Sequence, residues 1–568
     1  MQKRNRIISC VLLLLLVAVS PPYLSAQSDQ LRPVTDKYAI KNVTIVQAPG
    51  KVISNGSILI ENGIIKAVGS SISIPADAWT VEADSMFVYA GFISGLSSIG
   101  VVEPKDEREE LDDELTGTPP YDYAGITPDR SVRSVLSEAE KSIKDFRALG
   151  FTAAHTASDG GMLPGTGSVI LLGGSTANDM LVKENISMFS QFKGADGVYP
   201  NTVIGVMAKY RDIYRKASQA LAYQKRYQSN STGMERPESD EVLEAFYPVV
   251  SKSMPVMFRT EGIKDIMRAK ALQKDLGFSI MFGEVRQGWD AIPYFKSLGS
   301  PVFLSLDLPE WKEEEKSEES DDGSDGEEEK EPTSEELEKQ ALQKRQNEIV
   351  KRYYTQASQY SSNGVRYGFS TLKVKPKDFK ANLLKVIENG LTEDQALAAL
   401  TTQPARILGL SNTMGSIEVG KMANLIISDT AYFSKDSNVR YVFVDGVKYE
   451  YEVKKKKKKK SGGEPVDVAG AWSYSTETPQ GNGEGVITIK GTPENYTGTM
   501  TLSFNNSTND IEGIVVNGNN LSFSVKTNVG QEITIEISMD IDGDTFEGTL
   551  SVAEFGSFPM EGSKEPEN

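Results

Sequence analysis

The middle of the chain repeats one pattern: apolar residues at helical spacing are followed directly by a short apolar strand. The helix and strand of each pair are expected at residues 132–150 and 151–154, at 263–277 and 278–282, and at 289–298 and 302–306. Gly150 and Gly277 follow the first two helical runs, as glycine often does at the end of a helix. Repeated βα units predict a mainly parallel sheet covered by helices, and over this length a (β/α)8 TIM-like barrel.

Before this region, residues 38–90 read as short strands joined by turns. Ser57–Glu61 and Ile64–Val68 flank the pair Asn62-Gly63. Both residues of such a turn need positive φ, so Asn-Gly between apolar runs is a strong hairpin signal. We therefore expect a small β unit ahead of the barrel.

The end of the chain has a different character. Residues 454–463 are a lysine run followed by Ser-Gly-Gly, a composition typical of a linker. Residues 464–562 alternate apolar and polar side chains, with turn residues about every ten positions. This pattern predicts a C-terminal antiparallel β-barrel or sandwich domain.

Charge is distributed unevenly along the sequence. The formal net charge of the chain is −18, which argues against a nucleic-acid partner because phosphate binding needs a basic face. Residues 310–331 hold 13 acidic and 3 basic side chains. Such a run repels itself and buries little apolar surface, so we expect a disordered insertion within the barrel.

The first 26 residues have the pattern of an export signal. Lys3, Arg4 and Arg6 precede the apolar run Ile7–Val19, and Ala26 ends a small-residue cleavage site. The single cysteine of the chain lies within that run. We therefore predict an exported protein, periplasmic or extracellular, with no disulfide and no stable membrane span after the signal is removed.

A specific resemblance appears near the end of the predicted barrel. It is carried by Leu391–Leu397, Gln403–Gly409 and Gly415–Leu425, and upstream by Ile58–Val68 and Gly91–Ile93. Together these stretches resemble the amidohydrolase superfamily, nearest to its imidazolonepropionase-like branch. The resemblance implies that residues 91–404 form the barrel and that residues 38–90 and 405–453 join as one small composite β-sandwich.

The resemblance also implies a chemistry. Amidohydrolases cleave carbon–nitrogen bonds other than peptide bonds with one or two divalent metals, held by histidines, often a carboxylated lysine, and an aspartate. The corresponding positions here are Leu96 and Ser98, Val169–Leu172, Arg259, Gly283-Glu284, and Leu372. Because the chain contains only one histidine, the metal set is missing, and we expect no metal and no other cofactor.

Four residues remain as candidates for a binding site at the barrel mouth: Arg259, Glu284, His155 and Lys373. The first three fall at or just after apolar strands, where the functional rim of such a barrel lies. A plainer interpretation is available for each. His155 fits a hydrogen-bonded structural residue, Arg259 and Glu284 fit an internal salt bridge, and Lys373 fits a solvated loop.

Three functional hypotheses follow. The first is an exported, metal-free pseudoenzyme that binds a small-molecule ligand or a partner chain with an intact amidohydrolase site. The second is an active carbon–nitrogen hydrolase with an atypical site near Arg259, Glu284 and Lys373, either without metal or with carboxylate ligands alone. The third is a surface or glycan-binding protein that acts through the C-terminal β domain. Whether the chain is an enzyme stays open at this point.

Overall fold

The computed structural model describes residues 36–103, 111–311, 334–452 and 466–565, with short gaps at 479–480, 493–494, 503–506, 529–531 and 553–555. Two compact units make up the chain, Met1–Val453 and Lys454–Asn568. The predicted signal peptide (1–26), the linker (454–463) and all but the first two residues of the acidic insertion (310–331) lie outside the described residues.

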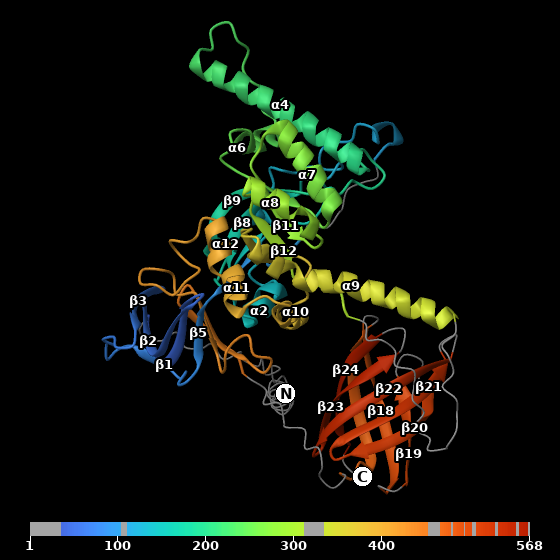
Figure 1. The fold of residues 1–568 in the computed structure, drawn as a ribbon. Coiled ribbons are helices and arrows are strands. Elements are labelled where there is room, and N and C mark those ends of the chain that lie inside the picture. Colours follow the sequence, from blue (N-terminus) through green and yellow to red (C-terminus); the bar gives the residue numbers. More distant parts are fainter. Residues whose placement is uncertain are drawn as a thin grey trace, which may run out of the picture. The chain divides into compact units, whose positions relative to one another are not determined.

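The centre of the first unit is an eight-stranded sheet in the order β13-β12-β11-β10-β9-β8-β7-β6 (Figure 1). Its strands are β6 (Phe92–Ser97), β7 (Phe151–Thr156), β8 (Gly165–Leu171), β9 (Leu181–Ser190), β10 (Val256–Arg259), β11 (Ile280–Val285), β12 (Val302–Ser305) and β13 (Tyr367–Ser370). The amide of Thr371 donates to the carbonyl oxygen of Leu96 at 2.9 Å, which joins the two edges of the sheet. The predicted TIM-like barrel is confirmed.

One strand departs from the ideal barrel. β8 runs antiparallel to both β7 and β9, whereas the other neighbouring pairs of the sheet are parallel. Only residues 157–164 join β7 to β8, and a parallel crossover needs a dozen residues or more. The carboxyl ends of β6, β7 and β9–β13 therefore share one edge of the barrel, and β8 ends at the opposite edge.

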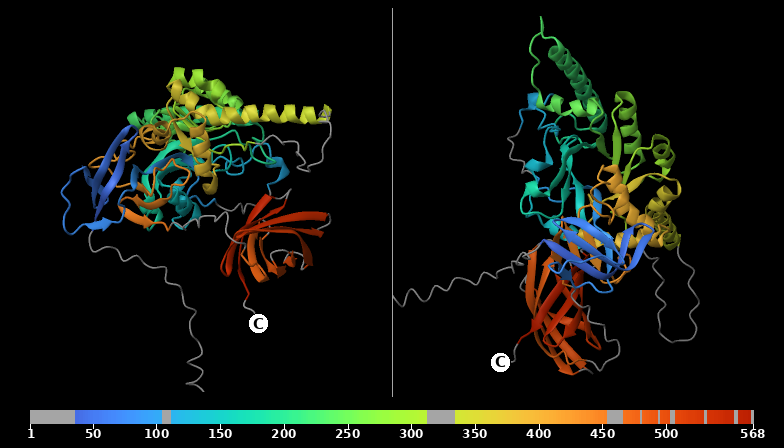
Figure 2. Two further views of the ribbon diagram at one scale, coloured as in Figure 1. Left: turned by 60° about the horizontal axis from the view of Figure 1, so that its bottom comes forward. Right: turned by 90° about the vertical axis from the view of Figure 1, so that its left-hand side faces the viewer.

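Helices cover the outside of the barrel, and α4 and α9 extend beyond it (Figures 1 and 2). The α-helices are α2 (Lys141–Ala148), α3 (Ala177–Met180), α4 (Val203–Ser229), α5 (Glu241–Ala245), α6 (Tyr247–Val250), α7 (Ile263–Leu276), α8 (Ile292–Leu298), α9 (Ser334–Ser362), α10 (Pro376–Glu388), α11 (Glu393–Leu400) and α12 (Thr402–Ile407). Short 3-10 turns are η1 (Asp113–Leu115), η2 (Val132–Ser134) and η3 (Trp289–Ala291). No helix of the described residues combines the length and apolar character needed to cross a lipid bilayer.

The helix predicted at 132–150 begins only at Lys141. Residues before it pair with the chain that follows β6: the amide of Val102 donates to Val135, and the amide of Ser137 donates to Gly100. These backbone hydrogen bonds form an isolated β-bridge, so the apolar spacing at 132–139 reflects burial of a loop rather than a helix face. The helix before Gly277, by contrast, ends as predicted, with that glycine at φ +79°.

The second sheet of this unit joins the two ends of its sequence. Its strands are β1 (Lys37–Ala48), β2 (Lys51–Glu61), β3 (Ile64–Gly69), β4 (Trp79–Val81), β5 (Phe87–Ala90), β14 (Leu425–Ser428), β15 (Val439–Val444) and β16 (Val447–Glu450). β5 pairs with β14, and the predicted Asn62-Gly63 turn has φ of 50° and 73°. The Cα of Gly63 lies so close to Gly446 that a Cβ there would approach within 2.5 Å. The hairpin turns at Gly63 and Gly446 therefore pack directly against each other, and this contact joins the two parts of the composite unit.

The second unit is a closed barrel of eight antiparallel strands, which decides between the predicted barrel and sandwich. Its strands are β17 (Gly470–Thr478), β18 (Gly481–Thr492), β19 (Asn495–Leu502), β20 (Ser507–Asn517), β21 (Asn520–Asn528), β22 (Glu532–Asp542), β23 (Thr545–Val552) and β24 (Gly556–Lys564). Trp472, Phe523 and Phe546 are buried in its core, and the indole of Trp472 donates to the carbonyl oxygen of Val468 at 3.0 Å.

Candidate functional site

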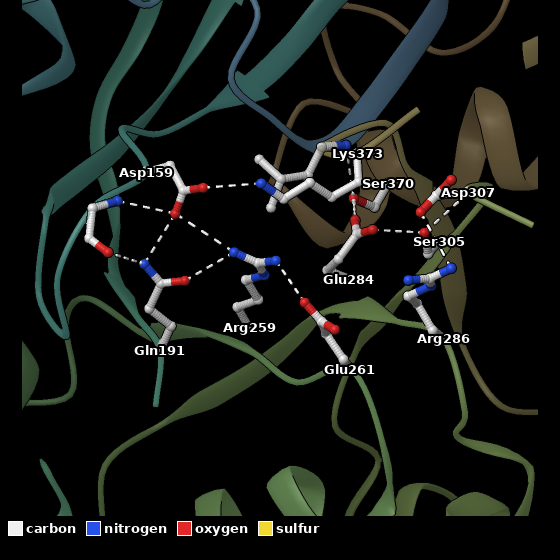
Figure 3. A network of polar contacts seen from close by, with 12 residues as sticks. Asp159, Gln191, Arg259, Glu261, Glu284, Arg286, Ser305, Asp307, Ser370 and Lys373 are labelled. Carbon is white, nitrogen blue, oxygen red and sulfur yellow. Dashed lines mark hydrogen bonds and ion pairs between the residues drawn. The ribbon is translucent and has the colours of Figure 1, made fainter. Parts of the chain in front are cut away.

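The barrel mouth carries two neighbouring groups of polar side chains, shown in Figure 3. The first, the ion-pair cluster, consists of Asp159, Gln191, Arg259, Glu261 and Lys373. The second, the serine–glutamate cluster, consists of Glu284, Ser305 and Ser370. All of these residues lie at or just beyond the carboxyl ends of β7 and β9–β13, the edge that carries function in barrels of this kind.

Asp159 is the centre of the ion-pair cluster. Its carboxylate accepts from Lys373 Nζ at 3.0 Å and from Gln191 Nε2 at 3.0 Å. Arg259 lies 3.5 Å from the same carboxylate, donates to Gln191 Oε1 at 3.0 Å, and pairs with Glu261 at 2.6 Å. Two of the sequence candidates, Arg259 and Lys373, are thus brought together by an aspartate that the sequence interpretation did not single out.

The protonation of Asp159 follows from these contacts. Burial alone would raise the pKa of this carboxyl. The hydrogen bonds from Gln191 and Lys373, with the positive charges of Lys373 and Arg259, outweigh that effect and lower the pKa to about 2. Asp159 is therefore an anion at any ordinary pH, and the two cations around it are compensated.

Glu284 has a different environment. Its side chain is fully buried, and its oxygens are bonded to the hydroxyls of Ser305, at 2.6 Å, and Ser370. No ion pair joins Glu284 to Arg259 among the residues described, so the predicted pairing of these two candidates does not form. Burial raises the pKa of Glu284, although the two serine hydrogen bonds and the charges of Arg259 and Arg286 act against that rise.

His155 lies outside both clusters. It is fully buried on β7, with Nδ1 3.0 Å from the carbonyl oxygen of Gly95 and Nε2 2.9 Å from Ser187 Oγ. A carbonyl oxygen only accepts, so Nδ1 carries the proton and Nε2 accepts from the serine. Burial lowers the pKa of His155 to about 4. Its ring packs against Gly167, where a Cβ would meet Nε2 at 2.3 Å, so both nitrogens are engaged in the barrel wall.

The positions that the resemblance assigns to metal ligands on the first and last strands include two leucines. Leu96 and Leu372 are buried in one apolar cluster with Met257 and Phe303. The ring of Phe303 lies so close to Gly95 that a Cβ there would meet it at 1.9 Å. Apolar side chains therefore occupy the barrel interior where the first and last strands would present ligands.

The remaining positions do not supply ligands either. The lysine position falls at Val169–Leu172, but this stretch ends β8, and reversed β8 ends at the edge opposite the mouth. Within the described residues, no three His, Cys, Asp or Glu side chains are placed to hold a metal ion. The one histidine has no free nitrogen, and both oxygens of Glu284 are taken by serines. These residues do not fit the family's metal centre.

Sequence reasoning missed five members of the clusters: Asp159, Gln191, Glu261, Ser305 and Ser370. Each of these polar residues ends a strand or follows it within three positions, and Asp159 precedes the pair Gly160-Gly161. Gln191 donates to both of those glycine carbonyls, at 2.8 and 3.0 Å. A polar residue at or just after the end of a buried strand was the available signal; the sequence analysis applied it to Arg259 and Glu284 but not to these five residues.

Comparisons with known proteins agree with the fold. Residues 345–448 match the model of the amidohydrolase family. The solved structure of an amidohydrolase from Thermotoga maritima MSB8 is 21% identical, covers 73% of this chain and 100% of its own, and has a TM-score of 0.57. A prolidase complexed with N-methylphosphonate-L-proline (14% identity) and a Xaa-Pro dipeptidase with bound methionine (16%) each cover 73% of this chain and 100% of their own, with TM-scores of 0.41 and 0.40. No curated protein sequence matches.

The class defined by these observations is a TIM-like barrel with a composite β unit, the amidohydrolase fold. Residues 345–448, which match the amidohydrolase-family model, lie within it, and the C-terminal β-barrel forms a separate unit.

Proposed function

We propose that this chain is an exported amidohydrolase-fold pseudoenzyme that binds a ligand or a partner chain and does not carry out metal-assisted hydrolysis. The observation that carries the proposal is the apolar filling of the barrel interior by Leu96, Met257, Phe303 and Leu372, where the family holds metal. Metal-assisted hydrolysis needs a cation to lower the pKa of a bound water, and the part of the chain that the structure describes holds no ligand set for such a cation. The signal-like residues 1–26 support export.

The ion-pair cluster is the best candidate for the binding surface. The side chain of Lys373 is 42% exposed and that of Glu261 49% exposed, so both signs of charge reach solvent at the mouth. Arg259 is only 14% exposed and is fixed by three side chains, which pre-orients its guanidinium group. A carboxylate on a ligand or on a partner would meet Lys373 and Arg259 already positioned for charge-assisted hydrogen bonds.

The two alternatives have less support. An atypical hydrolase would need an accessible base that is free of other partners. The Asp159 carboxylate is held by cations, the exposed Glu261 is ion-paired with Arg259, and Glu284 is fully buried. A glycan-binding surface on the C-terminal barrel usually needs exposed aromatic rings. In the described part of that barrel, the large apolar residues that are exposed are Val466 and Val515, while its tryptophan lies in the core.

A hydrolysis assay tests the absence of activity. The mature chain is incubated with linear amides, cyclic amides and cyclic imines, with Zn²⁺, Mn²⁺ or Mg²⁺ added in turn. We expect no turnover above the rate without protein. Turnover that Asp159→Asn abolishes would contradict the proposal and establish the atypical hydrolase instead.

A melting assay tests the binding surface. N-acetyl amino acids, which carry a free carboxylate, are added to the wild type, to Arg259→Met and to Lys373→Met. Binding to the folded state stabilises it by an amount that grows with the logarithm of one plus the ratio of ligand concentration to Kd, and so raises the melting temperature. We expect the rise in the wild type and its loss in both variants, while Lys375→Met, an exposed lysine outside the cluster, serves as the matched control. Equal shifts in all four proteins would remove the ion-pair cluster from consideration.

A further inference from the structure

Glu284 occupies an unusual position in the barrel. It lies near the carboxyl end of β11, its side chain is 0% exposed, and its backbone has φ of +56°. A residue with a Cβ rarely adopts this left-handed conformation, and such strain persists only where the surroundings fix it. The contacts of the side chain are therefore expected to be specific.

The charges around Glu284 are all paired with other groups. Arg259, on β10, is paired with Glu261 at 2.6 Å, and Arg286 is paired with Asp307 at 3.3 Å. From the segment after β13, Lys373 is bound to Asp159. The residues of β6 that face this region are uncharged. No cation of the described residues lies within 4 Å of Glu284, so its ionised form would be a buried, unpaired anion.

The hydrogen bonds at Ser370 give an independent indication of the protonation state of Glu284. Its Oγ is bonded to Glu284 and also lies 3.0 Å from the carbonyl oxygen of Leu96, on β6. A serine hydroxyl has one proton and can donate to only one of these two oxygens. If Glu284 is ionised, one oxygen–oxygen contact has no proton between its atoms. If Glu284 is protonated, it donates to Ser370, and Ser370 donates to Leu96.

We infer that Glu284 is a neutral carboxylic acid whose proton completes a hydrogen-bonded chain from β11 through Ser370 to Leu96, closing the barrel between β13 and β6. This chain of hydrogen bonds runs beside a second contact at the seam of the barrel, the junction between β13 and β6. In that contact the amide of Thr371 donates to the same carbonyl oxygen at 2.9 Å. Ser305 donates to the other oxygen of Glu284 and holds the acid in place. This role in the fold is separate from the ligand binding proposed above.

A dependence on pH follows from this arrangement. Because burial raises the pKa of Glu284 in the folded state, the folded state binds the proton more tightly than the unfolded state does. The stabilisation by Glu284 is therefore complete below the ordinary pKa of glutamate and is lost as the pH rises through the raised value. Ionisation would remove the proton between Glu284 and Ser370 and weaken the seam at Thr371.

Infrared spectroscopy tests the protonation directly. A protonated carboxylic acid has a carbonyl stretch distinct from that of a carboxylate. At neutral pH the folded wild type should show this band, Glu284→Gln should lack it, and Glu261→Gln, a change at an exposed carboxylate of the same mouth, should retain it. A wild-type spectrum without the band, or a band that survives in Glu284→Gln, would overturn the inference.

Hydrogen exchange at Thr371 tests the seam. In the wild type, exchange of this amide should accelerate with pH beyond the intrinsic chemical dependence, whereas in Glu284→Gln, which stays neutral, it should follow the intrinsic dependence alone. Identical pH dependence in the two proteins would overturn the role of the proton. If Glu284→Gln does not fold, the wild type alone tests the inference. Its acid band and the protection of the Thr371 amide from exchange must then disappear together as the pH is raised.

Discussion

Both clusters of the barrel mouth hold a carboxyl group away from water, but they stabilise it in opposite protonation states. Asp159 keeps its charge because Lys373 and Arg259 surround it, and its pKa is lowered to about 2. Glu284, at the carboxyl end of the same barrel, has only hydroxyl groups as bonded partners, and its pKa is raised. Partners rather than residue type therefore decide which acid is charged, as expected when a carboxyl leaves water.

This difference gives the two clusters different proposed roles. The ion-pair cluster is partly exposed, and we propose that it exchanges an internal partner for a ligand. The serine–glutamate cluster is closed to solvent and can act only on the barrel itself. Both clusters lie in a barrel whose interior is apolar. Substitutions in the apolar interior, the ion-pair cluster and the serine–glutamate cluster are expected to differ in the size of their effects.

The largest effect is expected in the apolar interior. Phe303→Ala removes a fully buried ring that packs against Gly95, and a change of this kind costs about 3–5 kcal/mol of unfolding free energy. Denaturant unfolding measures it. A loss below about 1 kcal/mol, within the range of a surface substitution, would show that the interior is not a packed core and would reopen the question of a metal site there.

A smaller effect is expected at Asp159. Lowering its pKa from 3.8 to about 2 corresponds to about 2 kcal/mol of stability as an upper limit. The folded pKa is depressed, so this stability is present above the unfolded value and is lost as the pH falls toward 2. Wild type and Asp159→Asn should therefore differ most above about pH 4 and converge in acid. A difference that does not change with pH would contradict the ion-pair assignment.

Ser305→Ala is expected to cost about 1–2 kcal/mol, because it leaves a buried oxygen of Glu284 without a donor. If Glu284 is neutral, this cost should not depend on salt. Unfolding in low and high salt measures it. A cost that changes strongly with salt would indicate a charged Glu284 and remove the contrast between the two clusters.

The smallest effect is expected at Lys373. Its side chain is 42% exposed, and exposed ion pairs contribute about 0–1 kcal/mol. Lys373→Met should therefore change the melting temperature little while removing the proposed ligand binding. A large loss of stability would instead assign Lys373 to the structure of the mouth.

The sequence predicted local structure where local chemistry decides it. Asn62-Gly63 and Gly277 adopt the positive φ that these residues favour, and the repeated helix–strand pattern gave the barrel. The predictions from sequence were wrong where contacts between distant segments determine the local structure. The apolar spacing at 132–139 predicts a helix, but residues 135 and 137 pair with the chain after β6. The reversal of β8 depends on a short connection that apolar spacing does not reveal.

The candidate site was only partly accessible for the same reason. Strand ends indicated that Arg259 and Glu284 lie near one another, but their partners come from other strands, and strand order and register determine them. Asp159 and Ser370 are separated by more than 200 positions from residues that they help to arrange. The number of histidines, by contrast, is a property of composition, so the presence of a single histidine could be read from the sequence alone.

The most direct measurement is the metal content of the mature chain. The protein is produced in zinc-supplemented medium with an affinity tag free of histidine, dialysed, and examined by elemental analysis. Structural and catalytic zinc sites need three or four cysteine, histidine or carboxylate ligands, and no such set exists among the described residues. We expect far less than one zinc ion per chain. One zinc ion or more per chain, held through dialysis, would contradict this expectation.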